Sequence, residues 1–407
     1  MRSMPASLAA VAVFVLALAC GTGSTLSAKL MYQLEVTNSV GEMAHYSKPV
    51  FISLLAFVSL VPFWPLHYIS HYCTSGLSVA PSPLPRNYIL KLAPLACLDV
   101  FATIAVNAGL MYVSGSMYQL SGATCIVFVS AFRILLRIGK PFEKHNYLGV
   151  ALISLSFGLS SGAAMVLSDA GGPDDGGDVA TGLALCMLGN LFFALQVVWE
   201  EIMMTDDGSE PPTPPLVLVG VQGCWGVCII LALCPLVARL PGSDVGGCLE
   251  NLADTLAMFA SPDNSMLRLL AVAFVVSIGC STAAGSLVTY LLDGVWRSIL
   301  KTLRPVALWA TNLSIYYLFS EGEYGEHWTT ASWFQLVGML GMLCGIYIYN
   351  GPAAPEAPAD PKDVEAGNDT AEVIDPFGPV RIAVSGRSSA RRSTVGGSSR
   401  KTLTGAA

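Results

Sequence analysis

The sequence predicts an all-α integral membrane protein with ten transmembrane helices, and two observations support this fold class. First, 53% of the 407 residues are hydrophobic and only 12% are charged, whereas soluble domains carry roughly 25% charged residues. Second, the apolar residues form runs of about 20, the length that crosses a bilayer as a helix. Much of the surface is therefore expected to face lipid, and the bilayer is the first predicted partner.

The apolar runs follow one another along the chain, with polar segments between them. The predicted spans are Ser7–Ala28, Pro49–Ile69, Leu90–Met111, Tyr118–Leu136, Tyr147–Leu167, Ala180–Met203, Pro215–Leu236, Leu269–Leu291, Ser298–Phe319 and Ser332–Asn350. Between the seventh and eighth spans, Val245–Ala260 is expected to form a short amphipathic helix on the membrane surface. The first run has an alternative interpretation as a signal peptide, because Arg2 precedes it and Ala17-Leu18-Ala19 fits a cleavage site. Cleavage there would leave nine helices.

Basic residues are distributed unequally between the two sides of the predicted bundle. With the N-terminus in the cytosol, the cytosolic loops contain Arg86, Lys91, Arg133, Arg137, Lys140, Lys144, Arg297, Lys301 and Arg304. The opposite loops contain only Lys29, Lys48, Arg239 and Arg268. Because Lys and Arg are enriched in cytosolic loops, both termini are predicted to lie in the cytosol.

The spans divide into two sets of five. The predicted parts are a first five-helix repeat at 1–168, an acidic linker at 169–179, a second five-helix repeat at 180–350 and a disordered cytosolic tail at 351–407. An odd number of helices gives the two halves opposite orientations, as in the inverted repeats of many secondary transporters. The tail has too few large apolar residues to fold.

Several polar side chains fall inside the predicted spans, where charged groups usually face the bundle interior. Asp99 lies within an apolar run, which favours a functional role or an ion pair inside the bundle. Arg297, Lys301 and Arg304 share one helical face, and this face either binds an anionic ligand or snorkels to cytosolic headgroups. Glu200 either marks a membrane boundary or pairs with that basic face.

Other classes of function find little support in the sequence. Most of the 11 cysteines lie inside apolar runs, where a thiol behaves as a small hydrophobe, and no CxxC pair has metal-binding spacing. The histidines form no cluster and no Ser/His dyad is evident. The sequence therefore predicts no enzyme, no cofactor and no metal site. It also has no basic patch interleaved with aromatics, and so no nucleic-acid partner is expected.

Glycines recur every three or four residues in two of the spans. Gly220, Gly223 and Gly226 lie in the seventh span, and Gly338, Gly341 and Gly345 lie in the tenth. Small residues at this spacing let helices approach closely in lipid. The pattern is consistent with a homodimer or with tight packing inside each half.

Short motifs in order along the chain resemble those of a known family. Residues 21–29 read GTGSTLSAK, similar to "TGSxNTLSAK", and Asp99 precedes Gln119 by 20 residues. Residues 194–201 read ALQVVWEE, similar to "AxQMVxEE", and residues 297–310 follow the pattern "RMVLDSLRTVVIWA". The spans close with Tyr349-Asn350-Gly351. The chain thus resembles the F-type branch of solute carrier family 35, the nucleotide-sugar transporter group of the drug/metabolite transporter superfamily.

This resemblance implies an EamA-like fold that moves a small organic solute across an endomembrane by alternating access. The resemblance does not carry over a substrate; a nucleotide sugar or another anionic metabolite is one candidate class. Relatives point to the membrane of the Golgi, the endoplasmic reticulum or a lysosome-like organelle. The chain departs from the branch at Gln222 and Lys301, where an acid is usual, and at Gly122, where a base is usual. These departures make the interior more cationic. The alternative is a membrane scaffold that acts through its cytosolic tail.

The expected binding site lies near the midplane, between the halves. Its predicted lining is Asp99, Asn107, Tyr112, Gln119, Gln196, Tyr290 and Arg297, with Lys301, Arg304 and Glu200 as secondary candidates. Amide side chains would give directional hydrogen bonds, Arg297 would hold an anionic group, and the tyrosines would stack on a ring or sugar. Asp99 is expected to take a proton, because burial raises a carboxyl pKa.

Overall fold

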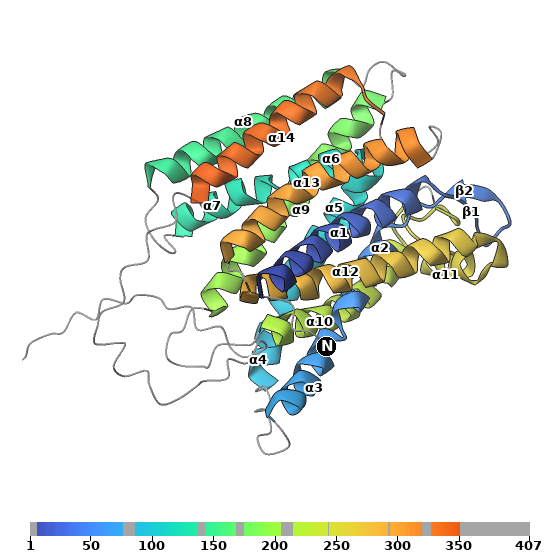
Figure 1. Ribbon diagram of the computed structural model, residues 1–407. Coiled ribbons are helices and arrows are strands. Elements are labelled where there is room, and N and C mark those ends of the chain that lie inside the picture. Colours follow the sequence, from blue (N-terminus) through green and yellow to red (C-terminus); the bar gives the residue numbers. More distant parts are fainter. Residues whose placement is uncertain are drawn as a thin grey trace, which may run out of the picture.

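The computed structural model describes residues 6–75, 86–136, 143–167, 175–204, 215–242, 244–291, 294–319 and 327–350. The helices are α1 (Ala6–Gln33), α2 (Pro49–Leu60), α3 (Phe63–Ser75), α4 (Arg86–Lys91), α5 (Ala93–Tyr112), α6 (Gly115–Ser121), α7 (Thr124–Leu136), α8 (Lys144–Leu167), α9 (Asp175–Met204), α10 (Pro215–Val237), α11 (Leu252–Ala260), α12 (Ser265–Leu291), α13 (Gly294–Ser314) and α14 (Thr330–Asn350). A 3-10 turn, Pro262–Asn264, precedes α12, and a π-helical turn, Ile315–Phe319, follows α13. The protein is a helical bundle (Figure 1).

Eight helical stretches of the described chain are long and apolar enough to cross a membrane. They match eight of the ten predicted spans, and the helical membrane class is thereby confirmed. The helices α8 and α13, which correspond to the fifth and ninth predicted spans, are not among the eight. In α13 the basic residues Arg297, Lys301 and Arg304 lower the mean hydropathy of the first turns.

Several predicted spans consist of two helical pieces. The second span is α2 followed by α3, and the break coincides with Pro62, which has no backbone N–H to donate. The fourth span is α6 followed by α7, separated at Gly122 and Ala123. The surface helix expected over residues 245–260 is shorter than predicted, because it is α11 alone, beginning after the cap of Asn251.

Helix α1 contains the first apolar run, for which a signal peptide was the alternative interpretation. It runs without interruption from Ala6 to Gln33 and packs along α12, with further contacts to α13. Ala17, the first residue of the Ala17-Leu18-Ala19 motif, is fully buried against Ala284 and Leu300. In this structure the first apolar run is therefore part of the bundle.

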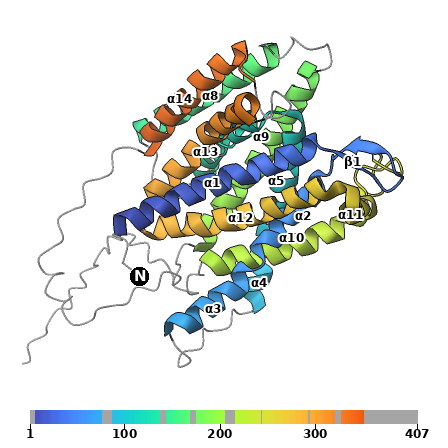
Figure 2. The same cartoon turned by 45° about the vertical axis from the view of Figure 1, so that its right-hand side comes forward.

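The most extensive helix contacts join the two predicted halves. They are α1 with α12, α5 with α9, and α8 with α14. Figures 1 and 2 show α8 beside α14 at one edge of the bundle and α1 beside α12 in its middle. Helix α10 packs against α2, α3 and α5. Each of these contacts pairs a helix from residues 1–168 with one from 175–350.

Close approach of these helices depends on glycine. A Cβ atom at Gly149 of α8 would lie 2.6 Å from the backbone N of Tyr349 in α14. The glycines predicted to mediate packing behave in the same way: Gly220 lies against Trp64, and Gly338 against Ser160. These contacts are between the halves and not inside each half, since α10 and α14 rest on α2–α3 and α8.

A small β-hairpin that the sequence did not predict connects α1 to α2. Its antiparallel strands are β1 (Glu35–Thr37) and β2 (Met43–His45). The turn contains Gly41 at φ +86°, a conformation that glycine adopts readily. The hairpin is tied to the α11–α12 connection, because Asn264 accepts from the N–H of Thr37 and donates to its carbonyl. We call the end of the bundle that carries this hairpin the hairpin end.

Candidate functional site

A cavity of about 270 Å³ lies inside the bundle, between helices of both halves. The helices α1, α2, α5 and α6 contribute Ser24, Thr25, Ala28, Ala56, Phe57, Leu60, Asp99, Thr103, Val106, Asn107, Leu110 and Tyr118, and α9 and α12 contribute Phe193, Phe274, Ile278 and Thr282. Most of this lining is apolar or aromatic, with hydroxyls, one amide and one carboxyl among the described residues. A concave apolar site with a few polar groups is typical of small-molecule binding.

Helix α5 places two of the predicted site residues in this cavity. Asp99, Thr103 and Asn107 follow one another at intervals of four, and such residues lie on the same face of a helix. The Asn107 side chain is buried and donates from Nδ2 to Ser53 Oγ at 2.9 Å. Ser53 in turn donates to the carbonyl of Pro49. The hydrogen bond to Ser53 therefore holds the amide of Asn107 in one orientation at the cavity wall.

Gln119 reaches the cavity wall through another residue. Its Nε2 donates to Thr25 Oγ1 at 2.5 Å, and Thr25 lines the cavity from α1. Helix α6, which carries Gln119, begins at a fixed position because Ser114 caps it by accepting from the N–H of Met117. Gln119 thus positions a hydroxyl of the lining and is not itself a lining residue.

Lys29 fastens α1 to the end of α5 near the cavity. Its Nζ donates to the carbonyls of Leu110 at 2.9 Å, Met111 at 3.4 Å and Val113 at 2.8 Å. The last carbonyls of a helix lack intrahelical partners and carry partial negative charge, which a cation stabilises. Charge distribution alone predicts Lys29 to be a loop cation, although this residue closes the motif at residues 21–29.

Three of the remaining predicted site residues have described side chains, and these lie outside the cavity lining. Tyr112 is 40% exposed at the end of α5, and Gln196 is buried in α9 but is not among the residues that line the cavity. Arg304 donates to Ser281 Oγ at 2.7 Å and packs against Gly21, also outside the lining. The side chains of Glu200, Tyr290, Arg297 and Lys301 are outside the described part of the structure.

The described residues offer no metal site. Among them there is no group of three or more His, Cys, Asp and Glu side chains that could hold a metal ion. The chemistry available at the cavity is hydrogen bonding from hydroxyls and an amide, stacking on aromatic rings, and the charge or proton of Asp99. These groups suit the binding of a solute.

No protein-family model matches the chain. Solute carrier family 35 member F6 of Rattus norvegicus is 28% identical over 347 residues, which cover 84% of this chain and 88% of that protein. The Homo sapiens protein of the same name is 29% identical over 285 residues, covering 69% and 71%. An uncharacterized protein of Schizosaccharomyces pombe is 24% identical over 267 residues, covering 66% and 76%.

Among solved structures, one described as "Crystal structure of protein" aligns with 84% of this chain and 96% of its own, at 14% identity and a TM-score of 0.43. The alignments with the rat and human proteins extend over most of the spans from which the family resemblance was derived. They confirm that resemblance. The chain is a multi-pass membrane protein homologous to solute carrier family 35 member F6, a member of the F-type branch of solute carrier family 35 in the drug/metabolite transporter superfamily.

Proposed function

We propose that the protein is a carrier that moves a small organic solute across an endomembrane by alternating access. The observation that carries this proposal is the cavity, which is lined by residues of six helices from both halves. A site between two halves can be exposed to each side of the membrane in turn when the halves rock against each other. Homology to a solute carrier supports transport and not catalysis.

The order of the helix pairs supports an inverted repeat. Numbered as ten spans, the most extensive contacts join the first span to the eighth, the third to the sixth and the fifth to the tenth. If each span is replaced by its counterpart in the other half, five places away, the contact between the first and eighth spans becomes the contact between the sixth and third. The contact between the fifth and tenth spans is unchanged by this exchange. The contact between α2 and α10, the second and seventh spans, is likewise returned to itself. A two-fold relation between the halves produces this pattern.

The volume of the cavity and the charged groups near it indicate the size and charge of the solute. Its 270 Å³ is slightly below the roughly 300–1,000 Å³ typical of drug-sized ligand pockets, which favours a small metabolite. Asp99 is the carboxyl group in the described lining, and Asn107 supplies the amide. For an anionic solute such as a nucleotide sugar, we propose Arg297 and Lys301 as the groups that neutralise its charge, because both lie on the same face of α13 as Arg304.

The remaining assignments follow from the charge distribution and from the alternating mechanism. Both termini are assigned to the cytosol, so that the hairpin end faces the lumen. Tyr112, Gln196, Tyr290 and Glu200 are proposed to reach the solute pathway in a second conformation. Asp99 is assigned the role of proton acceptor.

The test is a ligand screen on purified, detergent-solubilised protein. Nucleotide sugars, nucleotides, amino acids, short peptides and organic cations are added, and a ligand of the folded state raises the melting temperature with its excess over Kd. We expect Asp99→Asn and Asn107→Ala to remove the response to a hit. Phe101→Leu is the matched control, because Phe101 lies on the same helix and is 48% exposed.

A hit that survives both cavity substitutions would contradict the assignment of the site. Transport of that hit in liposomes is the second measurement. A phenotype lost on deleting residues 351–407 but unchanged by Asp99→Asn would instead favour the scaffold function.

A further inference from the structure

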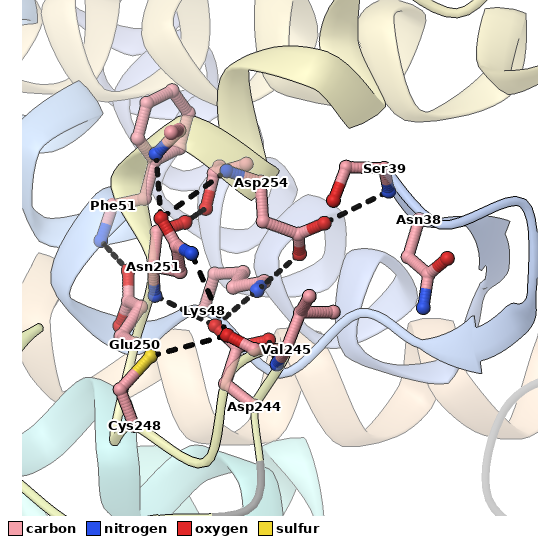
Figure 3. A network of polar contacts seen from close by, with 12 residues as sticks. Asn38, Ser39, Lys48, Phe51, Asp244, Val245, Cys248, Glu250, Asn251 and Asp254 are labelled. Atoms are coloured by element: carbon pink, nitrogen blue, oxygen red, sulfur yellow. Dashed lines mark hydrogen bonds and ion pairs between the residues drawn. The ribbon is translucent and has the colours of Figure 1, made fainter.

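A buried ion-pair cluster joins the two halves at the hairpin end (Figure 3). Lys48, between the hairpin and α2, has a side chain only 2% exposed. Its Nζ donates to Asp254 Oδ2 at 2.8 Å and to Asp244 Oδ2 at 2.5 Å. Both acids belong to the segment between α10 and α12. The cation is therefore supplied by the first half and both carboxylates by the second.

The carboxylates are also tied to backbone on both sides. Asp254 Oδ1 accepts from the N–H of Ser39 in the hairpin turn at 2.9 Å. Asp244 accepts from the N–H of Asn251 and from that of Val245, each at 2.7 Å. Opening this contact would break the bond from Ser39 to Asp254 and both bonds of Lys48, which cross between the halves, whereas the backbone bonds of Asp244 stay within the second half.

A third acid from the second half caps a helix of the first. The two carboxyl oxygens of Glu250 accept from the N–H groups of Val50 and Phe51, both at 2.8 Å. Val50 and Phe51 lie in the first turn of α2. The N-cap residue of this helix, Lys48, makes no side-chain capping hydrogen bond. The N-terminus of a helix carries partial positive charge and attracts an anion. We call Lys48, Asp244, Glu250 and Asp254 the Lys48 cluster.

An apolar core separates this cluster from the cavity. The core contains Ala28, Leu110 and Phe274, which line the cavity, and it extends to Tyr46 and Met258 beside the cluster. It also includes Met31 and Tyr32 from α1 and Leu267, Leu270 and Ala271 from α12. Side chains of both halves thus fill the route from the cavity to the hairpin end.

Resting on the carrier function proposed above, we propose that the Lys48 cluster and this apolar core form the gate that closes the cavity at the hairpin end, and that Glu250 is a proton-binding group that favours the closed gate. Closure requires that the hairpin and α2 meet α11 and α12. Opening requires that Lys48 and Glu250 leave their partners in the other half. The gate is therefore a contact between halves, as alternating access demands.

The charges around Glu250 explain the role of the proton. Burial raises the pKa of the Glu250 carboxyl to about 7, although the N–H groups of Val50 and Phe51 and the charge of Lys48 act to lower it. Asp244 raises it further. Burial and the charge of Glu250 hold the pKa of Tyr46 well above its usual range, so this neighbour stays neutral. Tyr32 and Cys234 also face Glu250.

Asp254 responds in a different pH range. Burial acts to raise the pKa of the Asp254 carboxyl, but the hydrogen bonds from Lys48 and Ser39 outweigh it and lower that pKa below its usual value. Asp254 therefore stays ionised at neutral and mildly acidic pH. In the open gate water solvates Glu250, whose pKa returns to 4.5. Between these values the equilibrium shifts toward the closed gate by up to about tenfold for each unit by which the pH falls.

The test is hydrogen–deuterium exchange on the full-length protein in lipid nanodiscs between pH 5.5 and 8, read by mass spectrometry and corrected for intrinsic exchange rates. We expect protection of peptides from residues 34–52 and 244–264 to be about 25-fold greater at pH 5.5 than at pH 8. Glu250→Gln should remove this pH response. Lys48→Met should lower protection of both peptides at every pH, because it leaves two buried carboxylates uncompensated.

Matched controls separate the gate from general destabilisation. Glu35→Gln removes an acid from the same hairpin, but one whose side chain is 64% exposed, and should behave as wild type. Peptides of α8 and α14 report whether each variant is folded. If Lys48→Met does not fold, Asp244→Asn serves in its place and should move the pH midpoint downward, since Asp244 raises the Glu250 pKa.

A pH response that persists in Glu250→Gln would overturn the role of the proton, and unchanged protection in a folded Lys48→Met protein would overturn the gate. The exchange experiment requires no solute. Failure of the carrier proposal would therefore be seen separately, as absence of ligand binding by a protein whose hairpin end still responds to pH.

Discussion

Replacing Glu250 by glutamine should change how the stability of the whole protein depends on pH. Burial raises the pKa of this carboxyl from 4.5 to about 7, so the folded protein binds a proton more tightly than the unfolded chain. Such a group stabilises the folded state fully below pH 4.5, and the stabilisation is lost as the pH rises through 7. Between pH 8 and pH 5 the folded state should gain roughly 2.5 kcal/mol from this one group.

The assay is thermal unfolding of detergent-purified wild type and Glu250→Gln at pH 5, 6, 7 and 8, followed by tryptophan fluorescence. The difference in Tm between the two proteins isolates Glu250 from the other titrating groups. It should change by several degrees in favour of the wild type as the pH falls. A difference in Tm that is constant across this range, or that grows with rising pH, would show that the pKa of Glu250 is not raised in the folded protein.

Three further predictions concern packing, helix capping and the cavity. Gly149→Ala should lower Tm, because the new methyl overlaps the α14 backbone and overpacking costs about 1–3 kcal/mol; Gly158→Ala, which meets nothing within 4 Å, should not lower it. Lys29→Met removes three hydrogen bonds to the end of α5 and should cost on the order of 2 kcal/mol in denaturant unfolding. In liposome transport of an identified solute, Asp99→Asn should lower the rate at least about tenfold, the effect of about 1.4 kcal/mol, whereas Phe101→Leu should leave it near wild type.

The spans were predictable because length and apolar composition determine them. The second predicted span coincides with the observed stretch Pro49–Ile69. The hairpin was not predictable in this way, because its strands are three residues long and are held by Asn264, far away in sequence. The helix breaks at Pro62 and Gly122 depend on the local backbone geometry of one or two residues. A mean hydropathy taken over about 20 residues does not detect them.

The site was only partly predictable from the sequence. Asp99 stood out because a carboxyl within an apolar run is costly unless it has a role. Thr25 and Ser53 did not, because a hydroxyl in a helix is satisfied by backbone carbonyls and gives little signal. Lys48 was counted as a loop cation, and its partner Asp244 lies 196 residues away. Only the packing of the two halves brings such groups together.

The pairing of α1 with α12 has a consequence for synthesis of the chain. Their facing ends are separated by about 230 residues, which takes roughly 12 to 46 seconds to translate. During that interval α1 has entered the bilayer without its main neighbour, and Thr22 and Thr25 are without their final burial. The same holds for α5 before α9 and for α8 before α14. The first five helices therefore cannot complete their packing as a unit, and a nascent chain that stops between the halves is expected to be a substrate for membrane quality control.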